Sequence, residues 1–263
     1  MKKIFNKVVL VLAIGTFFTG CEENAIPELT TPVSQDGAKA KFFFHSDAAP
    51  AANFFFGNEK VTAAGSTTAG DEQALAYKAV YPSNAYASVP AGNVTISARD
   101  LSGAEIVSTQ ETLTAGENYS IYLVGAADDF EIVVMEDNLP PDDEVKMYWR
   151  FVHTMANVPF TVDAYAVKAA VPVTDNAPAQ PAQVIPLAMD VDFGEGGEYV
   201  ELEPGSYTFK IFNSTEDYDP LTSTPFILHS VNVGTLGRSY TTQIRGTYSE
   251  PLGSGKIDFW RDR

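Results

Sequence analysis

Residues 149–165, WRFVHTMANVPFTVDAY, decide the fold of this chain. A strand pattern ends at His153, a short loop carries Pro159, and a second strand pattern runs through Asp163 and Tyr165. In a β-strand, residues on the same face recur at every second position. The stretch therefore predicts a strand-loop-strand unit.

A fainter copy of this unit lies earlier in the chain, at residues 41–55, KFFFHSDAAPAANFF. Two further blocks also recur in the same order. Residues 85–96 align with residues 198–209, and residues 115–125 align with residues 236–246. The aligned pairs include His45 with His153, Pro50 with Pro159, Asn53 with Asp163, Phe55 with Tyr165, Tyr86 with Tyr199, Gly92 with Gly205, Tyr119 with Tyr240 and Gly125 with Gly246. Three blocks in one order indicate an internal duplication.

Short alternating runs and the lack of any long stretch with helical periodicity predict an all-β chain. We expect two tandem immunoglobulin-like antiparallel β-sandwich domains, because each copy holds enough strands for two packed sheets. The expected segments are a signal peptide at 1–20, a flexible tether at 21–37, a first sandwich at 38–138, a Pro-rich linker at 139–144 and a second sandwich at 145–263.

The N-terminal residues have the layout of a signal peptide, with a basic start followed by an apolar run. Cys21 is the only cysteine and directly follows Gly20, an order that resembles the lipobox of bacterial lipoproteins. The resemblance implies that Cys21 is acylated and anchors the protein to a membrane. Glu22 and Glu23 resemble the export signal of Bacteroidetes-type lipoproteins, which implies an outer membrane location and surface exposure. The alternative is a plain secretory signal peptide with an incidental cysteine.

The chain is strongly acidic, with 17 basic against 34 acidic residues. Three of the basic residues lie within the signal peptide, at Lys2, Lys3 and Lys7. Proteins that bind nucleic acid usually present a basic face to the phosphates. The composition therefore argues against nucleic acid as a partner.

The strand-loop-strand units also resemble a bacterial family of domains of unknown function, numbered 4397. In the second copy the matching residues are 150–153, Pro159 and 162–165, and in the first copy they are His45, Asp47, Pro50, 90–92 and 115–119. The chain departs from the family pattern where Asn53 replaces Asp and where residues 155–158 replace S-P-D-A. The resemblance implies tandem immunoglobulin-like sandwiches on a secreted or lipid-anchored protein, and it implies no known reaction.

No catalytic motif occurs in the sequence, which lacks G-x-S-x-G, H-E-x-x-H, C-x-x-C and a phosphate-binding glycine loop. We therefore predict a protein without catalytic residues, cofactors or a metal site. His45 and His153 occupy equivalent positions in separate domains in this alignment, so nothing brings them together. Alternation places His153 with Trp149 and Phe151, and His45 with Phe43, so we expect histidines at the edges of the cores rather than ligands.

Asp163, Asp190 and Asp192 have different sequence neighbours, which predict different roles for them. Asp163 lies on the same face as Tyr165, where it can fix the loop or accept a hydrogen bond from His153. Asp190 and Asp192 stand in the sequence DVDFG, which faintly resembles a calcium loop. They alternate with apolar residues, which favours a strand with an acidic outer face, and weak calcium binding is the alternative.

We interpret the chain as a lipid-anchored cell-envelope protein that acts as a non-catalytic binding or structural module. The alternative is a surface glycan-binding protein, which needs exposed aromatic rings to stack against sugars. Tyr218 and Tyr248 are the best candidates for such rings, since both lie in loop-like sequence. The expected partners are a membrane, through Cys21, and a protein or glycan whose identity the sequence leaves open.

Overall fold

Seventeen β-strands account for the regular structure of the described residues, and none of these residues lies in a helix. The structure is a computed structural model, and it describes residues 37–63, 73–127, 129–174, 178–250, 252 and 255–263. The predicted signal peptide, the acylation site Cys21 and nearly all of the predicted tether lie outside these residues. No helix capable of crossing a membrane is found in the described ranges.

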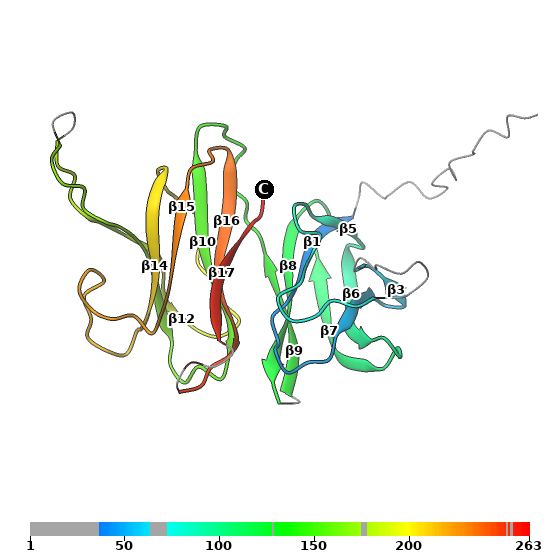
Figure 1. The fold of residues 1–263 in the computed structure, drawn as a ribbon. Coiled ribbons are helices and arrows are strands. Elements are labelled where there is room, and N and C mark those ends of the chain that lie inside the picture. Colours follow the sequence, from blue (N-terminus) through cyan, green and yellow to red (C-terminus); the bar gives the residue numbers. More distant parts are fainter. Residues whose placement is uncertain (1–36, 64–72, 128, 175–177, 251, 253–254) are drawn as a thin grey trace, which may run out of the picture. The chain divides into compact units, whose positions relative to one another are not determined.

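The first sandwich consists of two sheets (Figure 1). One sheet has the order β4-β1-β8-β9, with β5 also paired to β1. Its strands are β1 (Ala38–Phe44), β4 (Val80–Tyr81), β5 (Ala87–Val89), β8 (Asn118–Ala126) and β9 (Asp129–Glu136). The other sheet has the order β3-β2-β6-β7. Its strands are β2 (Ala52–Phe56), β3 (Glu59–Lys60), β6 (Gly92–Asp100) and β7 (Glu105–Leu113).

The second sandwich repeats this arrangement. One sheet has the order β13-β10-β16-β17 and the other has the order β12-β11-β14-β15. The strands of the first of these sheets are β10 (Met147–Ala156), β13 (Val200–Glu201), β16 (Arg238–Thr247) and β17 (Lys256–Arg261). The strands of the other are β11 (Val162–Lys168), β12 (Gln183–Val191), β14 (Gly205–Asn213) and β15 (Ile227–Val233). The prediction of an all-β chain with two tandem sandwiches is confirmed.

Each sandwich departs in one respect from the antiparallel sheets that we expected. β1 pairs with β8 in parallel, and β10 pairs with β16 in parallel. In both sandwiches, therefore, the first strand lies beside a late strand that runs in the same direction. The strand-loop-strand unit carries the chain from one sheet to the other, so β1 and β10 form no hairpin with the strand that follows each of them.

Alternation along the first strands separates two kinds of buried side chain. From β1, Ala40, Phe42 and Phe44 enter the core of the first sandwich. From β10, Trp149 and Phe151 enter the core of the second. The side chains between them point away from these cores, yet they are also buried.

A third apolar cluster explains this second set of buried side chains. Its buried members are Phe43, Tyr122 and Val124 from the first sandwich and Val152 from the second. The sheet that contains β1 and the sheet that contains β10 thus pack against each other (Figure 1). Phe43 stacks on Tyr122 with ring centroids 4.6 Å apart. Residues 36–263 accordingly form one compact unit.

The strand pairing also corrects the alignment of the two copies. Lys41 pairs with Ser120, and Arg150 pairs with Thr241. Because Ser120 and Thr241 are equivalent in the third repeated block, Lys41 corresponds to Arg150. The pairing of His45 with His153 is therefore wrong by one residue, and His45 corresponds to Thr154.

Candidate functional site

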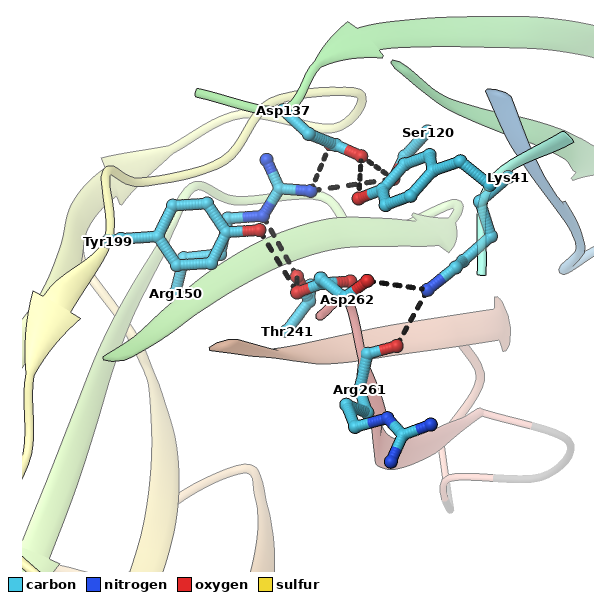
Figure 2. A network of polar contacts seen from close by, with 9 residues as sticks. Lys41, Ser120, Asp137, Arg150, Tyr199, Thr241, Arg261 and Asp262 are labelled. Atoms are coloured by element: carbon cyan, nitrogen blue, oxygen red, sulfur yellow. Dashed lines mark hydrogen bonds and ion pairs between the residues drawn. The ribbon is translucent and has the colours of Figure 1, made fainter. Parts of the chain in front are cut away.

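Eight polar side chains occupy the interface between the two sandwiches, four from each one. They form four repeat-equivalent pairs: Lys41 with Arg150, Tyr86 with Tyr199, Ser120 with Thr241, and Asp137 with Asp262. We call this set the interface network, and Figure 2 shows most of it. It has an approximate two-fold symmetry that follows from the duplication.

Within each sandwich, an aspartate just after the last strand accepts two hydrogen bonds. Asp137 follows β9 and accepts from Tyr86 Oη and from Ser120 Oγ, each at 2.7 Å. Asp262 follows β17 and accepts from Tyr199 Oη at 3.0 Å and from Thr241 Oγ1 at 2.7 Å. These two halves are the same motif built twice.

The cations join the halves, because each one crosses to the opposite sandwich. Arg150 donates from Nη2 to the carboxylate of Asp137 and from Nε to Thr241 Oγ1 at 2.9 Å. Lys41 donates from Nζ to the backbone oxygen of Arg261 at 2.6 Å and of Asp262 at 3.5 Å. Figure 2 shows both cations reaching toward the other sandwich's chain.

Each cation also lies over a tyrosine of its own sandwich. Lys41 Nζ is 4.9 Å from the ring centroid of Tyr86, and Arg150 Cζ is 4.9 Å from that of Tyr199. The negative face of an aromatic ring attracts a cation, more so when water is excluded. The tyrosines therefore bind the aspartate through their hydroxyl groups and support the cation through their rings.

Burial makes the protonation of this network unusual. Burial lowers the pKa of Lys41, although Asp262 and Asp137 act in the opposite direction. Burial also opposes the charge on Arg150, but Asp137, Tyr199, Asp262 and Tyr122 together outweigh it and raise the pKa of Arg150 well above its usual value. Burial raises the pKa of the Asp262 carboxyl. Lys41, Arg150, Asp137 and Asp262 all make their polar contacts within the network. Such an arrangement suits a structural junction better than proton transfer.

A cavity of about 740 Å³ opens at one end of this interface. Its walls include the cationic side chains of Lys39, Arg238, Arg261 and Arg263, together with Tyr86 and Asp262 of the interface network. We call it the basic cavity. Figure 2 shows the Arg261 guanidinium turned away from the interface network.

His45 lies in the interface rather than at the edge of a core. Its Nδ1 is 2.7 Å from Thr154 Oγ1 of the other sandwich, and its ring packs beside Phe43 and Tyr122. Burial lowers the pKa of His45 well below its usual value. The expectation of a core-edge histidine is thus wrong for His45, because its strand face is covered by the second sandwich.

His153 lies on the core-facing side of β10, as the alternation predicts. It is fully buried, and neither ring nitrogen has a hydrogen-bond partner among the described residues. Burial lowers the pKa of His153 to about 4. Its ring meets Phe193 edge-on with centroids 6.0 Å apart. A neutral imidazole in an apolar setting is a packing residue.

Asp163 fixes the loop and makes no hydrogen bond to His153. Its Oδ1 accepts from the backbone N–H of Asp190 at 2.6 Å, and its Oδ2 accepts from the Tyr218 hydroxyl. The Tyr165 and Tyr218 hydroxyl groups are 2.9 Å apart. Of the two roles considered for Asp163, the structure supports the first.

The carboxylate of Asp190 is occupied by hydroxyl groups rather than arranged around a cation site. Its Oδ1 accepts from Thr161 Oγ1 at 2.6 Å and from Ser214 Oγ at 3.0 Å. Asp192 is exposed. No group of three or more His, Cys, Asp or Glu side chains suited to a metal occurs among the residues described by the structure.

The surface of the described residues offers few aromatic rings. Tyr218 and Tyr248, the expected exposed rings, are half-buried. Tyr218 stacks on Phe212 with centroids 4.3 Å apart, and Tyr248 packs edge-on against Phe160 and Phe226. No Phe, Tyr or Trp within the described ranges is exposed. The flat aromatic platform that would favour sugar binding is thus missing from this part of the chain.

Sequence reasoning missed the interface network entirely. No role was predicted for Lys41, Asp137 or Asp262, and Arg150 was noted only as part of the match to the family pattern at residues 150–153. The signal that could have found them is the repeat itself. Once the first strands are aligned one residue apart from the histidine match, a cation, a tyrosine, a hydroxyl and an aspartate all recur at equivalent positions.

The family model described as "Domain of unknown function (DUF4397)" matches residues 38–165. This confirms the family resemblance over the first sandwich and into β11 of the second. Among curated proteins, none matches this chain.

Two solved structures illustrate the level of structural likeness. A putative cell adhesion protein from Bacteroides ovatus matches with 9% identity and a TM-score of 0.26, over 86% of this chain and 98% of its own. CBMbc, a family CBM26 module of Eubacterium rectale Amy13K in complex with maltoheptaose, matches with 10% identity and a TM-score of 0.24, over 84% of this chain and 96% of its own. We draw nothing about ligands from likenesses at this level.

Proposed function

We propose that this protein is a lipid-anchored, non-catalytic module of the cell envelope, in which two sandwiches are joined into a single binding or structural unit. The observation that carries this proposal is the interface network. Its titratable groups are buried and bonded to one another, so they hold two domains together instead of serving a reaction.

The histidines support the non-catalytic part of the proposal. His45 and His153 are buried, and their pKa values are lowered by that burial. A general base must reach a substrate within hydrogen-bonding distance. Neither imidazole has a path to solvent-borne substrate, since both are closed off by packed side chains.

The anchor rests on Cys21 and the sequence before it. Stable attachment of a protein to a membrane requires two acyl chains or an equivalent pair of signals. A diacylated Cys21 meets this requirement, and residues 22–37 then separate the membrane from the first strand. The outer membrane, with the sandwiches facing the cell exterior, is the location that Glu22 and Glu23 favour.

Metabolic labelling with an alkyne analogue of palmitate tests the anchor. The natural chain is expected to incorporate the label and to partition into the detergent phase of a Triton X-114 extract, whereas Cys21→Ser is expected to do neither. Labelling that persists in Cys21→Ser would contradict the anchor. Digestion of intact cells by an added protease then separates surface exposure from a periplasmic location.

A glycan-binding role is the second candidate, and the half-buried rings do not favour it. A glycan array probed with the full-length protein tests it directly. Saturable binding to a neutral oligosaccharide would support the glycan role despite the absence of an exposed ring platform among the described residues.

A further inference from the structure

The basic cavity is unusual for a chain with this charge. Outside the signal peptide the chain has 14 basic against 34 acidic residues, and four of those 14 line this one cavity. The interface network beneath it holds two cations and two aspartates, which leaves no surplus negative charge to balance the rim. The cavity is therefore a positive site in a negative protein.

Three of the four cations lack an acidic partner. Within the part of the chain that the structure describes, Lys39, Arg238 and Arg261 form no ion pair. Arg263 lies 3.8 Å from Asp142 and donates to the Pro141 oxygen at 3.2 Å. Like charges that converge without counter-ions are unfavourable, and a bound anion relieves this repulsion.

The approximate two-fold symmetry supplies a built-in control. The position equivalent to Arg261 is Glu136, and the position equivalent to Arg263 is Asn138. Glu136 and Asn138 line the corresponding hollow at the other end of the interface, which has a volume of only about 130 Å³. Duplication alone would give two similar ends, so the larger volume and the reversed charge belong to the basic cavity specifically.

The walls indicate the size and the chemistry of the occupant. A volume of about 740 Å³ falls within the range of roughly 300–1,000 Å³ that is usual for small-molecule sites. Guanidinium groups bind phosphate and carboxylate oxygens through paired hydrogen bonds. Leu139, Pro140 and the ring of Tyr86 add an apolar wall.

We propose that the basic cavity binds a small anion with at least two negative charges, presented by phosphate or carboxylate groups. Lys39 comes from the first sandwich and Arg238 and Arg261 come from the second, so the bound anion bridges both. The proposal deepens the proposed binding role, but it does not depend on acylation of Cys21.

Isothermal titration calorimetry with the full-length protein in detergent tests the proposal, with pyrophosphate and citrate as separate probes. At least one probe is expected to bind, with an affinity that falls as salt is added because the contacts are ionic. Arg261→Gln and Arg238→Gln are each expected to weaken binding about tenfold or more, since each removes a charge-assisted hydrogen bond. Lys60→Gln is the matched control. It removes an exposed lysine on β3, in the sheet of the first sandwich that does not contain β1, and is expected to leave affinity within about twofold.

Pyrophosphate and citrate also distinguish a phosphate ligand from a carboxylate ligand. Lys39→Gln provides a second test at an exposed position if an arginine variant fails to fold. The proposal is overturned if neither probe binds at low ionic strength, or if the folded cavity variants bind as tightly as Lys60→Gln. The proposal would also be overturned if the protein bound a polymeric uronate but neither pyrophosphate nor citrate. Cys21→Ser is expected to keep full anion affinity, so a failed anchor and a failed site are separate results.

Discussion

Arg150 and Lys41 occupy equivalent positions on β10 and β1, and each crosses to the opposite sandwich. Arg150 reaches a carboxylate, and both members of its pair with Asp137 are almost fully buried. Lys41 reaches only backbone carbonyl oxygens. Asp262, the equivalent of Asp137, consequently keeps one carboxylate oxygen, Oδ1, without a hydrogen-bond partner among the described residues.

This difference teaches that one duplicated motif can carry two energetic roles. A buried ion pair leaves an uncompensated charge when one partner is removed. A buried ammonium that donates only to backbone carbonyl groups leaves no single charged partner unpaired when it is removed. We therefore expect the Arg150 half to be far more sensitive to substitution than the Lys41 half.

Arg150→Met should have the largest effect, because it leaves the buried carboxylate of Asp137 without its cation. We expect the free energy of unfolding to fall by about 3–5 kcal/mol. Urea denaturation followed by tryptophan fluorescence measures this change. Lys60→Met on β3 is the control for charge removal, and a cost for Arg150→Met as small as that of the control would refute the asymmetry.

The histidines extend the comparison to pH, since His45 lies in the interface and His153 faces a core. The pKa of His153 falls from 6.5 to about 4 on folding. A lowered histidine pKa means that the unfolded chain binds the proton more tightly, so stability is lost as the pH falls from about 6.5 towards 4. At about 1.36 kcal/mol per pKa unit, the full loss amounts to about 3 kcal/mol.

Unfolding measured between pH 7 and pH 4 checks this prediction. His153→Leu puts an apolar side chain in the same place and is expected to make the curve shallower by the contribution of His153, whereas His153→Ala is expected to lower the free energy of unfolding even at pH 7 by about 2 kcal/mol. Parallel curves for the natural chain and His153→Leu would show that His153 does not titrate on unfolding. Unchanged stability of His153→Ala with a loss of ligand binding would overturn its structural role.

The two aspartates give the sharpest test of the comparison. Asp137→Asn leaves Arg150 buried without a carboxylate, so we expect a cost of about 3 kcal/mol. Asp262→Asn removes a carboxyl whose pKa is already raised by burial, so we expect about 1 kcal/mol. Equal costs in parallel urea titrations would mean that the two halves are balanced after all.

Lys41→Met should have the smallest effect, about 1 kcal/mol in either direction. The substitution loses two hydrogen bonds to backbone carbonyl groups, but it also removes the desolvation cost that lowers the pKa of Lys41. The melting temperature of the variant, compared with that of Arg150→Met, checks this value. A large loss of stability would place Lys41 on the same footing as Arg150.

Much of the fold was predictable from sequence, because alternation and the repeated blocks report strand faces directly. The blocks that pair Tyr86 with Tyr199 and Tyr119 with Tyr240 matched the structure. The match of His45 with His153 failed because the two histidines were aligned by residue type alone, although they occupy positions that are not equivalent. On a strand, a shift of one residue reverses which side faces the core, and this error hid the equivalence of Lys41 and Arg150.

The site itself could not be predicted from the same reasoning. Alternation separates two faces of a strand, but it does not say that both will be covered. Phe43 was assigned with His45 to a core edge, although it packs against the other sandwich. The Arg238 and Arg261 side chains converge on the basic cavity from two strands, and only the packing of one sandwich on the other brings Lys39 to them.

The parallel pairing of β1 with β8 also sets an order of folding. During synthesis, which proceeds from the N-terminus, the first sandwich cannot close until β8 (Asn118–Ala126) is available to pair with β1. Pairings between strands so distant in sequence form slowly. The second sandwich repeats the delay, since β10 waits for β16. Meanwhile Phe43 and Tyr122 lie on an uncovered face that invites aggregation. Lys41 and Asp137 lie on that same face, so charged groups interrupt the apolar surface that the first sandwich presents before the second sandwich covers it.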